Sequence, residues 1–340
     1  MRNAEEKVKR ALITGSAGFI GYHLCAGLLA GGWQVTGLDA MTDYYDVRLK
    51  QRRHAMLQQL PGFRAVEGRV ETPGLVAGLM GDGAPDIVVH LAAQAGVRYS
   101  IEAPRSYVEA NLLGTYEVLE AARAHVPGHL MIASTSSVYG ANTAMPYAES
   151  DKADHPLSFY AATKKAGEAM AHSYAHLYGM PVTMFRFFTV YGPWGRPDMA
   201  LFKFVKAVLE GAPIDIYNHG DMRRDFTFVD DLVAGIIGLA GVVPGGDPVG
   251  DFDSLSPVAP FRVVNIGNGA PVPLMEFVAA VEAATGRVAD KNFLPMQAGD
   301  VPATWADARL IEALIGPLPR TDVTEGVKRF VEWYRDYYRI

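Results

Sequence analysis

The 340-residue sequence has only one cysteine, Cys25, and no long apolar run. A single cysteine cannot form an internal disulfide, which suits a reducing compartment. The longest apolar stretch, residues 232–243, is interrupted by glycines and is far shorter than the ~20 residues that a membrane-spanning helix needs. The first ten residues, MRNAEEKVKR, are polar and run directly into an apolar segment, so we expect no signal peptide. These features predict a cytoplasmic protein without a membrane span.

A strong excess of charge of one sign and two common catalytic motifs are also missing. The 31 Lys and Arg residues against 37 Asp and Glu residues give a net charge of -6. This balance leaves no basic excess of the kind that binds nucleic acid. Neither the G-x-S-x-G nucleophile elbow nor the phosphate-binding P-loop occurs in the sequence. We therefore expect no nucleic-acid partner.

What is present is the composition of a large globular protein. Hydrophobic residues make up 49% and charged residues 20%, which excludes a disordered chain. The 35 glycines exceed the usual share of roughly 7% and follow no collagen period, so they belong in turns and close backbone contacts. A chain of 340 residues exceeds a single core of roughly 150–250 residues, so we expect one large unit and one smaller unit.

Short apolar strands alternate with longer helical patterns in the first half of the sequence. The strands are nearly continuous apolar runs, as expected where both faces of a sheet are covered. This alternation predicts right-handed βαβ units and a doubly wound parallel (Rossmann) sheet of the α/β class. The predicted strands are 10–14, 34–39, 86–92, 129–134 and 182–187. The predicted helices include 19–30, 108–125, 160–178, 273–285 and 323–338.

The pattern changes after residue 187, where proline and glycine become frequent. We predict that residues 1–187 form the cofactor-binding Rossmann domain and that 225–245 return to it. Residues 188–224 and 246–340 are assigned to a smaller C-terminal α/β domain that lies over the carboxyl edge of the sheet and binds the substrate. The segment 241–260 is a loop on composition, and the sequence reveals no function for its glycines.

The first predicted strand runs into GSAGFIG, a glycine-rich turn that opens a helix. Gly15 permits the tight turn, Gly18 lets the backbone approach a pyrophosphate, and Gly21 lets the helix pack closely on the strand. Asp39 ends the next strand, where an acid can bind both ribose hydroxyls of NAD and would repel a 2′-phosphate. The alternative is a glycine-rich turn beside an unrelated aspartate. The cofactor-binding residues predicted here are Gly15, Gly18, Phe19, Ile20, Gly21 and Asp39.

A Y-x-x-x-K pair, Tyr160 and Lys164, begins a helical pattern, and a spacing of four puts both side chains on one face. An ammonium beside a phenol lowers the phenol pKa, which makes a general base for an alcohol. Upstream, the hydroxyl cluster STSS at 134–137 ends a predicted strand and can hold a substrate oxygen. The alternative is a polar strand end beside an ordinary amphipathic helix.

Together these motifs resemble the extended short-chain dehydrogenase/reductases over nearly the whole chain. Four further stretches are similar to bacterial UDP-glucuronate 4-epimerases. They are DYYDVRLK from Asp43, GRPDMALFKF from Gly195, RRDFTFVDD from Arg223 and LPMQAGDVPATWAD from Leu294. The resemblance implies a Rossmann domain, tightly bound NAD and a UDP-sugar substrate. It also implies a homodimer formed through the helices at 108–125 and 160–178.

Carried over to this sequence, the resemblance implies a catalytic triad of Thr135, Tyr160 and Lys164. The cofactor contacts that it adds are Val70, Leu91, Ala93, Asn111, Tyr160 and Lys164. The substrate-binding residues that it implies are Thr135, Ser136, Ser137, Thr189, Arg196, Arg224 and Asp300. In this resemblance Arg224 contacts the nucleotide diphosphate with Asp300 nearby. The sugar lies close to Thr189 and Arg196.

Three positions depart from the related enzymes. Thr135 stands where UDP-galactose epimerases carry serine, and it keeps the hydroxyl. Arg69 and Val70 stand in the stretch VEGRVET, where an aspartate usually contacts adenine, so the usual adenine contact is missing. Gln297 replaces the second phosphate-binding arginine of UDP-galactose epimerases, which leaves Arg224 more of the diphosphate.

The implied reaction is the reversible inversion of carbon 4 of UDP-glucuronate to give UDP-galacturonate. Tyr160 removes the hydroxyl proton, NAD takes and returns the hydride, and a 4-keto sugar forms in between. This β-keto acid loses carbon dioxide readily, so the carboxylate must be held. The candidates for holding it are Thr135, Ser136, Ser137 and Thr189, with Arg196 guarding the pocket. For Arg196 the alternative is an exposed loop arginine.

Other reactions of related enzymes remain as alternatives. Sugar-nucleotide 4,6-dehydratases carry an Asp-Glu pair after the threonine, and UDP-glucuronate decarboxylases usually carry glutamate at the position of Ser137, whereas this sequence has hydroxyls there. A UDP-galactose 4-epimerase is the stronger rival, which Thr189 and the GRPDM segment disfavour. An NAD-sensing regulator on the same fold is disfavoured because such proteins typically lose the tyrosine–lysine pair.

Two further groups of side chains could have chemical roles. His172 and His176 lie at helical spacing, which could bind a metal, but no third ligand accompanies them. We expect an ordinary helix surface there and predict no metal site. The basic run at 48–53 lies near Asp39 and could touch a phosphate, but we expect a solvated helix face instead. Cys25 lies inside the first predicted helix, packed against the sheet.

Overall fold

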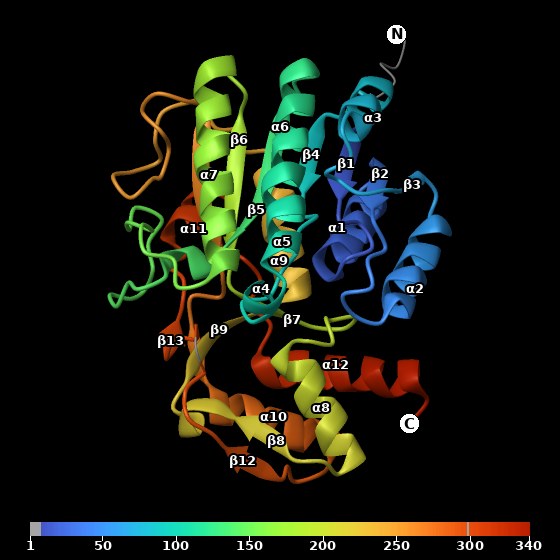
Figure 1. Ribbon diagram of the computed structural model, residues 1–340, viewed down its shortest axis with the longest axis vertical. Coiled ribbons are helices and arrows are strands. Elements are labelled where there is room, and N and C mark those ends of the chain that lie inside the picture. The colour runs from blue at the N-terminus through green and yellow to red at the C-terminus, as the bar shows by residue number, and fades with distance from the viewer. Residues whose placement is uncertain (1–7, 298) are drawn as a thin grey trace.

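Seven parallel strands form the central sheet of the protein, whose computed structural model describes residues 8–297 and 299–340 (Figure 1). Residues 1–7 of the segment MRNAEEKVKR lie outside the described residues. The strands are β1 (Arg10–Thr14), β2 (Gln34–Asp39), β3 (Phe63–Glu67), β4 (Ile87–His90), β5 (His129–Thr135), β6 (Val182–Phe187) and β10 (Phe261–Ile266). Their order across the sheet is β10-β6-β5-β4-β1-β2-β3, so the winding reverses between β1 and β4. The doubly wound parallel sheet predicted from the sequence is confirmed.

Helices cover both faces of this sheet, so its strands need no polar face. All residues of β4, β5 and β6 are buried, which explains their continuous apolar sequence. The helices of this unit are α1 (Phe19–Ala30), α2 (Val47–Gln58), α3 (Leu75–Gly83), α4 (Tyr99–Glu102), α5 (Pro104–Tyr107), α6 (Gly114–Ala124), α7 (Phe159–Tyr178), α9 (Val229–Ala240) and α11 (Arg309–Ile315). Figure 1 shows α6 and α7 in front of the sheet and α9 behind it.

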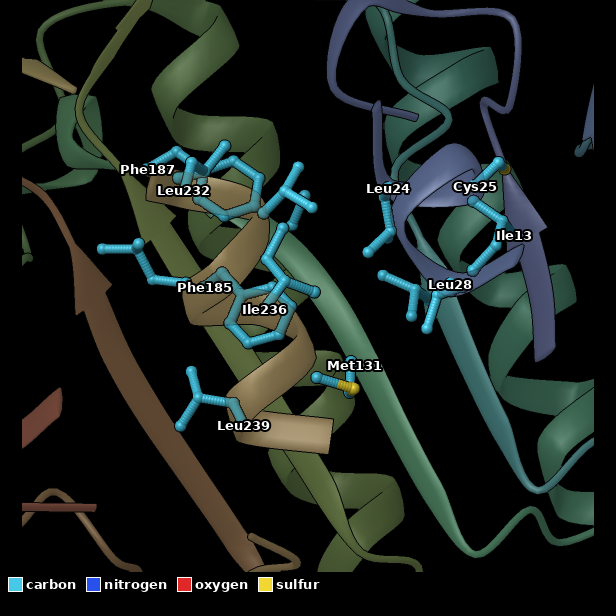
Figure 2. Close-up of a cluster of buried hydrophobic side chains, with 14 of the residues drawn as sticks. Ile13, Leu24, Cys25, Leu28, Met131, Phe185, Phe187, Leu232, Ile236 and Leu239 are labelled. Carbon is cyan, nitrogen blue, oxygen red and sulfur yellow. The ribbon is translucent and has the colours of Figure 1, made fainter. Parts of the chain in front are cut away.

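One hydrophobic core lies between the sheet and helices α1 and α9 (Figure 2). Leu28 of α1 and Ile236 of α9 both belong to it and are almost fully buried. Gly27 lets the two helices approach each other, because a β-carbon there would lie 3.1 Å from Cδ1 of Ile237. Cys25 is fully buried in the same core, as expected from the sequence.

A second unit lies below the central sheet in Figure 1. Its four-stranded sheet consists of β7 (Thr189–Tyr191), β9 (Arg223–Phe228), β11 (Pro271–Pro273) and β13 (Ala303–Thr304). Its two-stranded sheet pairs β8 (Ile214–Ile216) with β12 (Lys291–Phe293). Its helices include α8 (Ala200–Glu210), α10 (Leu274–Thr285) and α12 (Val323–Tyr338). The core of this unit is rich in aromatic residues, and the rings of Phe226 and Phe277 stack with centroids 4.0 Å apart.

Two strands belong to a different unit from the one that the sequence suggests. β10 lies within 246–340 but pairs with β6 at the edge of the central sheet. β9 lies partly within 225–245 but belongs to the smaller sheet. The sequence assignment of these two strands is wrong, because strand pairing is non-local and leaves no trace in local composition. Helix α9 does lie on the central sheet, beside α1, and the rest of the two-domain division stays a prediction.

The loop at 241–260 folds back onto helix α7. His172 Nε2 lies 2.9 Å from Oγ of Ser256, and His176 Nδ1 lies 2.7 Å from the carbonyl oxygen of Val258. The two histidines therefore contact this loop. In the described part of the chain, no group of three or more His, Cys, Asp or Glu residues is arranged to hold a metal ion. The helices described there also lack the combined length and apolar character needed to cross a bilayer.

Tyr191 carries a buried hydroxyl that has no hydrogen-bond partner among the described residues. Because an unsatisfied buried hydroxyl is costly, Tyr191→Phe should raise the free energy of unfolding by about 1 kcal/mol, measured by urea denaturation. A β-carbon on Gly326 would overlap this hydroxyl, so Gly326→Ala should destabilise the wild type more than the Tyr191→Phe protein. A loss of stability in Tyr191→Phe alone would contradict this account.

Candidate active site

The GSAGFIG turn after β1 is folded tightly against the neighbouring strand. Gly15 has a φ of 76°, a left-handed conformation that favours glycine. A β-carbon on Gly15 would lie 2.8 Å from the backbone nitrogen of Ala92, and one on Gly21 would overlap the carbonyl oxygen of Gly15. Glycine at both positions therefore lets helix α1 begin this close to the sheet, with Gly18 as its N-cap residue.

Asp39 ends β2 directly beside this turn. Its Oδ2 accepts a hydrogen bond from the N–H of Ala17 at 3.0 Å, and its Oδ1 accepts one from the N–H of Met41 at 2.9 Å. The carboxylate is thus fixed in place, while each oxygen keeps a lone pair for a further donor such as a ribose hydroxyl. Phe19 and Ile20, the first residues of α1, pack against the hydrophobic core.

Asn111 joins the segment after β4 to helix α7. It lies in a π-helical segment, Val108–Leu113, and exchanges two hydrogen bonds with the backbone of Gln94 at 2.8 and 3.0 Å. Its amide also donates to Oγ1 of Thr163 in α7 at 3.0 Å. Such π-helical segments are frequent at functional sites. This one interrupts the helix expected at 108–125 and lets Asn111 hold the loop after β4 against α7.

The other predicted cofactor residues lie around the same strand ends. Leu91, which precedes Ala93 in the segment after β4, donates its N–H to the carbonyl oxygen of Thr14 at 3.1 Å. Val70 is buried and packs against α6, where a β-carbon on Gly114 would lie 2.7 Å from its Cγ1. Leu91 therefore lies next to the glycine-rich turn, whereas Val70 contributes an apolar wall.

Thr135 ends β5 and caps the short 3₁₀ helix Ser136–Tyr139. Its Oγ1 accepts a hydrogen bond from the N–H of Ser137 at 3.2 Å and lies 3.3 Å from Oγ of the same residue. A hydrogen bond from Thr135 also lowers the pKa of Tyr160. Ser136 is partly exposed beside them. The structure therefore brings the hydroxyls of Thr135, Ser137 and Tyr160 together, as the sequence led us to expect.

A buried ion pair fixes helix α7 on strands β5 and β6. Arg186 of β6 donates to Glu168 of α7 through Nε at 2.9 Å and through Nη2 at 2.8 Å, and both side chains are 3% exposed. Ser134 of β5 donates to the same carboxylate at 2.7 Å. Because Thr135 follows Ser134 and Tyr160 begins α7, this pair controls the separation of the two predicted catalytic hydroxyls.

Tyr160 and Lys164 lie on α7 with strongly altered acidity. Burial raises the pKa of Tyr160, and the hydrogen bond from Thr135 and the charge of Arg196 offset this in part. Lys164 donates to the carbonyl oxygen of Ala133 at 2.9 Å, and burial lowers the pKa of its ammonium to about 8. The expectation that Lys164 lowers the phenol pKa is wrong for the protein's own groups. Desolvation dominates, and Arg196 is the cation that opposes it.

Arg196 is held by an acid and a tyrosine from two different segments. Its Nε donates to Oδ1 of Asp198 at 3.0 Å, and Oδ2 of Asp198 accepts a hydrogen bond from the Tyr44 hydroxyl at 3.2 Å. A β-carbon on Gly96 would lie 2.9 Å from the Tyr44 hydroxyl and 3.9 Å from Nη2 of Arg196. Sequence reasoning missed Tyr44 and Asp198, although both lie in the DYYDVRLK and GRPDM stretches.

Thr189, at the start of β7, lines a small apolar cavity together with Arg196 and Phe19. Phe19 belongs to the glycine-rich turn and its helix, whereas the other two residues are predicted to lie near the sugar. A residue predicted to bind the cofactor and two predicted to bind the sugar therefore line the same cavity.

The predicted nucleotide-binding residues meet on the second unit. Arg224 of β9 donates to the carbonyl oxygens of Val301 at 2.7 Å and Pro302 at 3.1 Å. Burial lowers the pKa of Arg224, and the charge of Asp300 opposes this. Asp300 also pairs with Arg98 at 3.6 Å. Sequence reasoning missed Arg98, which places a second cation beside the same carboxylate.

The basic run at 48–53 is not the uniformly solvated helix face that the sequence suggested. Arg48 and Arg52 are exposed, but Lys50 and Arg53 are only 7% and 0% exposed. These two positions are three apart on α2 and therefore share one face of the helix. That face turns two cations inward, where Arg53 binds Ala17 of the glycine-rich turn and Lys50 binds Thr42.

Known proteins resemble the chain closely. A family model described as the NAD dependent epimerase/dehydratase family matches residues 11–248. The chain belongs to this family. Among its members, a probable UDP-glucuronate 4-epimerase of Rhizobium meliloti is 58% identical over 334 residues, which cover 97% of this chain and 98% of that one. UDP-glucuronate 4-epimerase 4 of Arabidopsis thaliana is 46% identical over 332 residues, 96% of this chain and 75% of the plant protein.

A solved structure of an NAD-dependent epimerase agrees with the fold. UDP-glucuronic acid 4-epimerase of Bacillus cereus, in complex with UDP-glucuronic acid and NAD, superposes with a TM-score of 0.87 at 31% sequence identity. The superposition covers 97% of this chain and 100% of the other.

The residues of this family member fit NAD. Side chains are missing where a pyrophosphate would approach, at Gly15 and Gly18. Asp39 keeps acceptor capacity for ribose hydroxyls and would repel a 2′-phosphate, which favours NAD over NADP. Lys164 donates one hydrogen bond to Ala133 and keeps further N–H groups for a ribose hydroxyl. These residues would hold the dinucleotide across the ends of β1, β2 and β5.

The charge of Arg196 should be measurable at Tyr160. Because this charge opposes the effect of burial, Arg196→Gln should raise the Tyr160 pKa further. The measurement is a spectrophotometric titration of the phenolate band, taken as the difference between each protein and its Tyr160→Phe counterpart. Arg196→Lys keeps the charge and should shift the pKa less. An unchanged titration in Arg196→Gln would refute the coupling.

Proposed function

We propose that the protein is a UDP-glucuronate 4-epimerase, which inverts carbon 4 of UDP-glucuronate reversibly to give UDP-galacturonate and keeps NAD tightly bound. The observation that carries the proposal is the end of β5, where Thr135, Ser137 and Tyr160 gather three hydroxyls near Arg196. Hydroxyl donors and a nearby cation suit a sugar that bears a carboxylate. The relatives from Rhizobium meliloti and Bacillus cereus support the same substrate.

Tyr160 is the general base in this proposal. It takes the proton of the C4 hydroxyl and later returns it, while Thr135 holds the C4 oxygen by a hydrogen bond. NAD held by the glycine-rich turn, Asp39 and Lys164 would supply reversible hydride transfer at carbon 4 of the sugar. The phenolate of Tyr160 is a strong base because burial raises the pKa of the phenol. The hydrogen bond from Thr135 and the charge of Arg196 favour this ionised form. Lys164, anchored on Ala133, orients the ribose.

The carboxylate of the intermediate needs separate control. A β-keto acid loses carbon dioxide fastest when the bond to its carboxylate stands perpendicular to the ketone plane. Hydroxyl donors that fix another orientation prevent this loss, and the proposed donors are Thr135, Ser136, Ser137 and Thr189. Arg196 is already paired with Asp198, so its charge is partly neutralised. The hydroxyls therefore do most of the orienting.

The UDP part is assigned to the second unit. Arg224 is the proposed diphosphate ligand, with Asp300 beside it. Arg98, which pairs with Asp300 at 3.6 Å, supplies the second cation in place of the arginine that Gln297 replaces. The guanidinium of Arg98 also lies 5.1 Å from the ring centroid of Tyr217, an aromatic surface suited to a uracil ring.

Three related reactions fit the site less well. A UDP-glucose/UDP-galactose 4-epimerase binds a neutral sugar and needs no carboxylate donors at Ser136, Ser137 and Thr189. A 4,6-dehydratase or a UDP-glucuronate decarboxylase would use a carboxylic acid after the catalytic threonine, where this chain has serines.

We also propose that two chains form a homodimer through α6 and α7 and that the enzyme works in the cytoplasm. Large apolar side chains on or next to these helices are exposed, which supports an interface. They are Leu113, Tyr116, Leu177 and Tyr178. The single, fully buried cysteine suits a reducing compartment.

Product analysis tests the reaction directly. Purified protein is incubated with UDP-glucuronate or with UDP-glucose, without added NADH, and the products are resolved by ¹H NMR. We expect UDP-galacturonate from the acid and little product from the neutral sugar, because the donor set selects a carboxylate. UDP-xylose or a pentosyl 4-ketone as the main product would overturn the proposal in favour of decarboxylation. Efficient conversion of UDP-glucose would make the protein a neutral-sugar epimerase.

Tyr160→Phe tests the assignment of the base. The substitution removes the only atom of Tyr160 that can accept a proton, so turnover should fall by about 10²-fold or more while NAD stays bound. NAD content is read from the absorbance of the denatured supernatant. Tyr338→Phe, at an exposed tyrosine of helix α12, serves as the matched control and should keep full activity. Loss of NAD in Tyr160→Phe would make the residue structural.

A further inference from the structure

Arg53 of helix α2 is fully buried and takes no part in the mechanism above. Its Nη1 donates to the carbonyl oxygen of Ala17 at 2.8 Å and to the hydroxyl of Tyr45 at 2.9 Å. Its Nη2 donates to the carbonyl oxygen of Trp194 at 2.8 Å. All three acceptors are neutral. Its Nε is buried without a partner among the described residues, so this cation has neither a paired carboxylate in its hydrogen bonds nor a full set of acceptors.

A second buried cation makes this region still more positive. Nζ of Lys50 donates to the carbonyl oxygen and Oγ1 of Thr42 at 2.9 and 2.6 Å. The ring of Tyr45 has Nζ of Lys50 4.9 Å from its centroid and Cζ of Arg53 5.7 Å from it. Burial lowers the pKa of Lys50; nearby acids, Asp39 foremost, oppose this, and Arg53 adds to it. Buried cations that lack a paired anion are costly to the folded state.

The position of Arg53 suggests which anion offsets this cost. Ala17 lies inside the glycine-rich turn, between β1 and the N-cap residue Gly18. Its N–H binds Asp39, and its carbonyl oxygen binds Arg53. One residue of the turn therefore connects the predicted ribose-binding acid to the buried cation. The anion that this turn is built to admit is a dinucleotide diphosphate.

We propose that Arg53 is a positioning residue for the cofactor diphosphate. It braces the glycine-rich turn through Ala17 and supplies the positive charge that the diphosphate neutralises. Its hydrogen bond to the carbonyl oxygen of Trp194, two residues before Arg196, also connects the turn to the predicted sugar pocket. The inference rests on NAD being the cofactor and makes no assumption about the sugar. Without NAD the guanidinium has no carboxylate among its hydrogen-bond acceptors, since Asp39 is connected to it only through Ala17, and binding the diphosphate adds an anion to this region.

The test separates this charge effect from a merely structural brace. The variants are Arg53→Gln, which removes the charge but keeps a donor, and Arg53→Lys, which keeps the charge. Arg52→Gln, at the exposed neighbouring arginine, is the matched control. Each protein is stripped of NAD. Its Kd for NAD and for ADP-ribose is measured by isothermal titration calorimetry, and its Tm is measured with and without NAD.

Arg53→Gln should weaken both ligands by about tenfold or more, since both carry the diphosphate. Its Tm without NAD should be equal to or above that of the wild type, so the rise in Tm caused by NAD should shrink. Arg53→Lys should keep most of the affinity, and Arg52→Gln should behave as the wild type does.

Several results would overturn the proposal. An unchanged Kd with an equal loss of Tm in both states would make Arg53 a structural brace only. Weaker binding of NAD but not of ADP-ribose would place the effect at the nicotinamide end. If Arg53→Gln does not fold, Arg53→Lys decides, because a tenfold loss of affinity despite the retained charge also refutes the proposal. Since no sugar is present, failure here leaves the UDP-glucuronate proposal standing, and the reverse holds as well.

Discussion

The buried ion pair between Arg186 and Glu168 connects the two halves of the proposed catalytic site. It joins β6 to α7 and accepts Ser134 of β5 as a third member. The guanidinium of Arg186 also lies 4.6 Å from the ring centroid of Tyr139, whose hydroxyl donates to Oδ1 of Asn265 in β10 at 2.7 Å. Breaking such a pair on one side typically costs ~3–5 kcal/mol, because the remaining charge stays buried. The carboxylate of Glu168 thus connects α7 directly to β5 and β6, and through Arg186 and Tyr139 to β10.

Burial, more than pairing with a neighbour, determines the acidity of the catalytic groups. The phenol of Tyr160 becomes harder to ionise and the ammonium of Lys164 easier to discharge, both by desolvation. The charge that opposes this effect at Tyr160 comes from a residue distant in sequence, Arg196. Arg196 stands in the loop after β7, and it is held there by Asp198 and by Tyr44 from the segment after β2. The chemistry of α7 is therefore adjusted by side chains from two separate segments, the loop after β7 and the segment after β2.

Residues could be placed from the sequence where the local geometry demands particular residue types. The tight turn at Gly15 and Gly21 could be predicted because a side chain at either position would collide with the nearby backbone. The positions of Thr135 and Tyr160 were also predictable, because Thr135 ends strand β5 and Tyr160 lies in the first turn of helix α7, whereas their catalytic roles stay predictions. Asp39 could be placed because it is the last residue of strand β2.

The sequence misled where an outcome depended on distant partners. β10 looked like part of the second unit because nothing local indicates that it pairs with β6. Lys50 and Arg53 looked solvated because helical spacing shows which residues share a face but not what covers that face. The acidity of Tyr160 was misjudged because a spacing of four reveals a neighbour in sequence and not the depth of burial. These three errors concern tertiary contacts, whereas the π-helical segment within the helix predicted at 108–125 is an error of local structure.

The late position of β10 in the chain has a consequence for biosynthesis. β10 is the outermost neighbour of β6, yet it is translated only after β7, α8, β8 and β9 of the second unit. A nascent chain that has emerged only as far as β6 therefore has an open sheet edge with unpaired backbone groups. The central sheet cannot be completed on the ribosome before β7, α8, β8 and β9 of the second unit have been made. The two units therefore fold together, and neither corresponds to one contiguous block of the sequence.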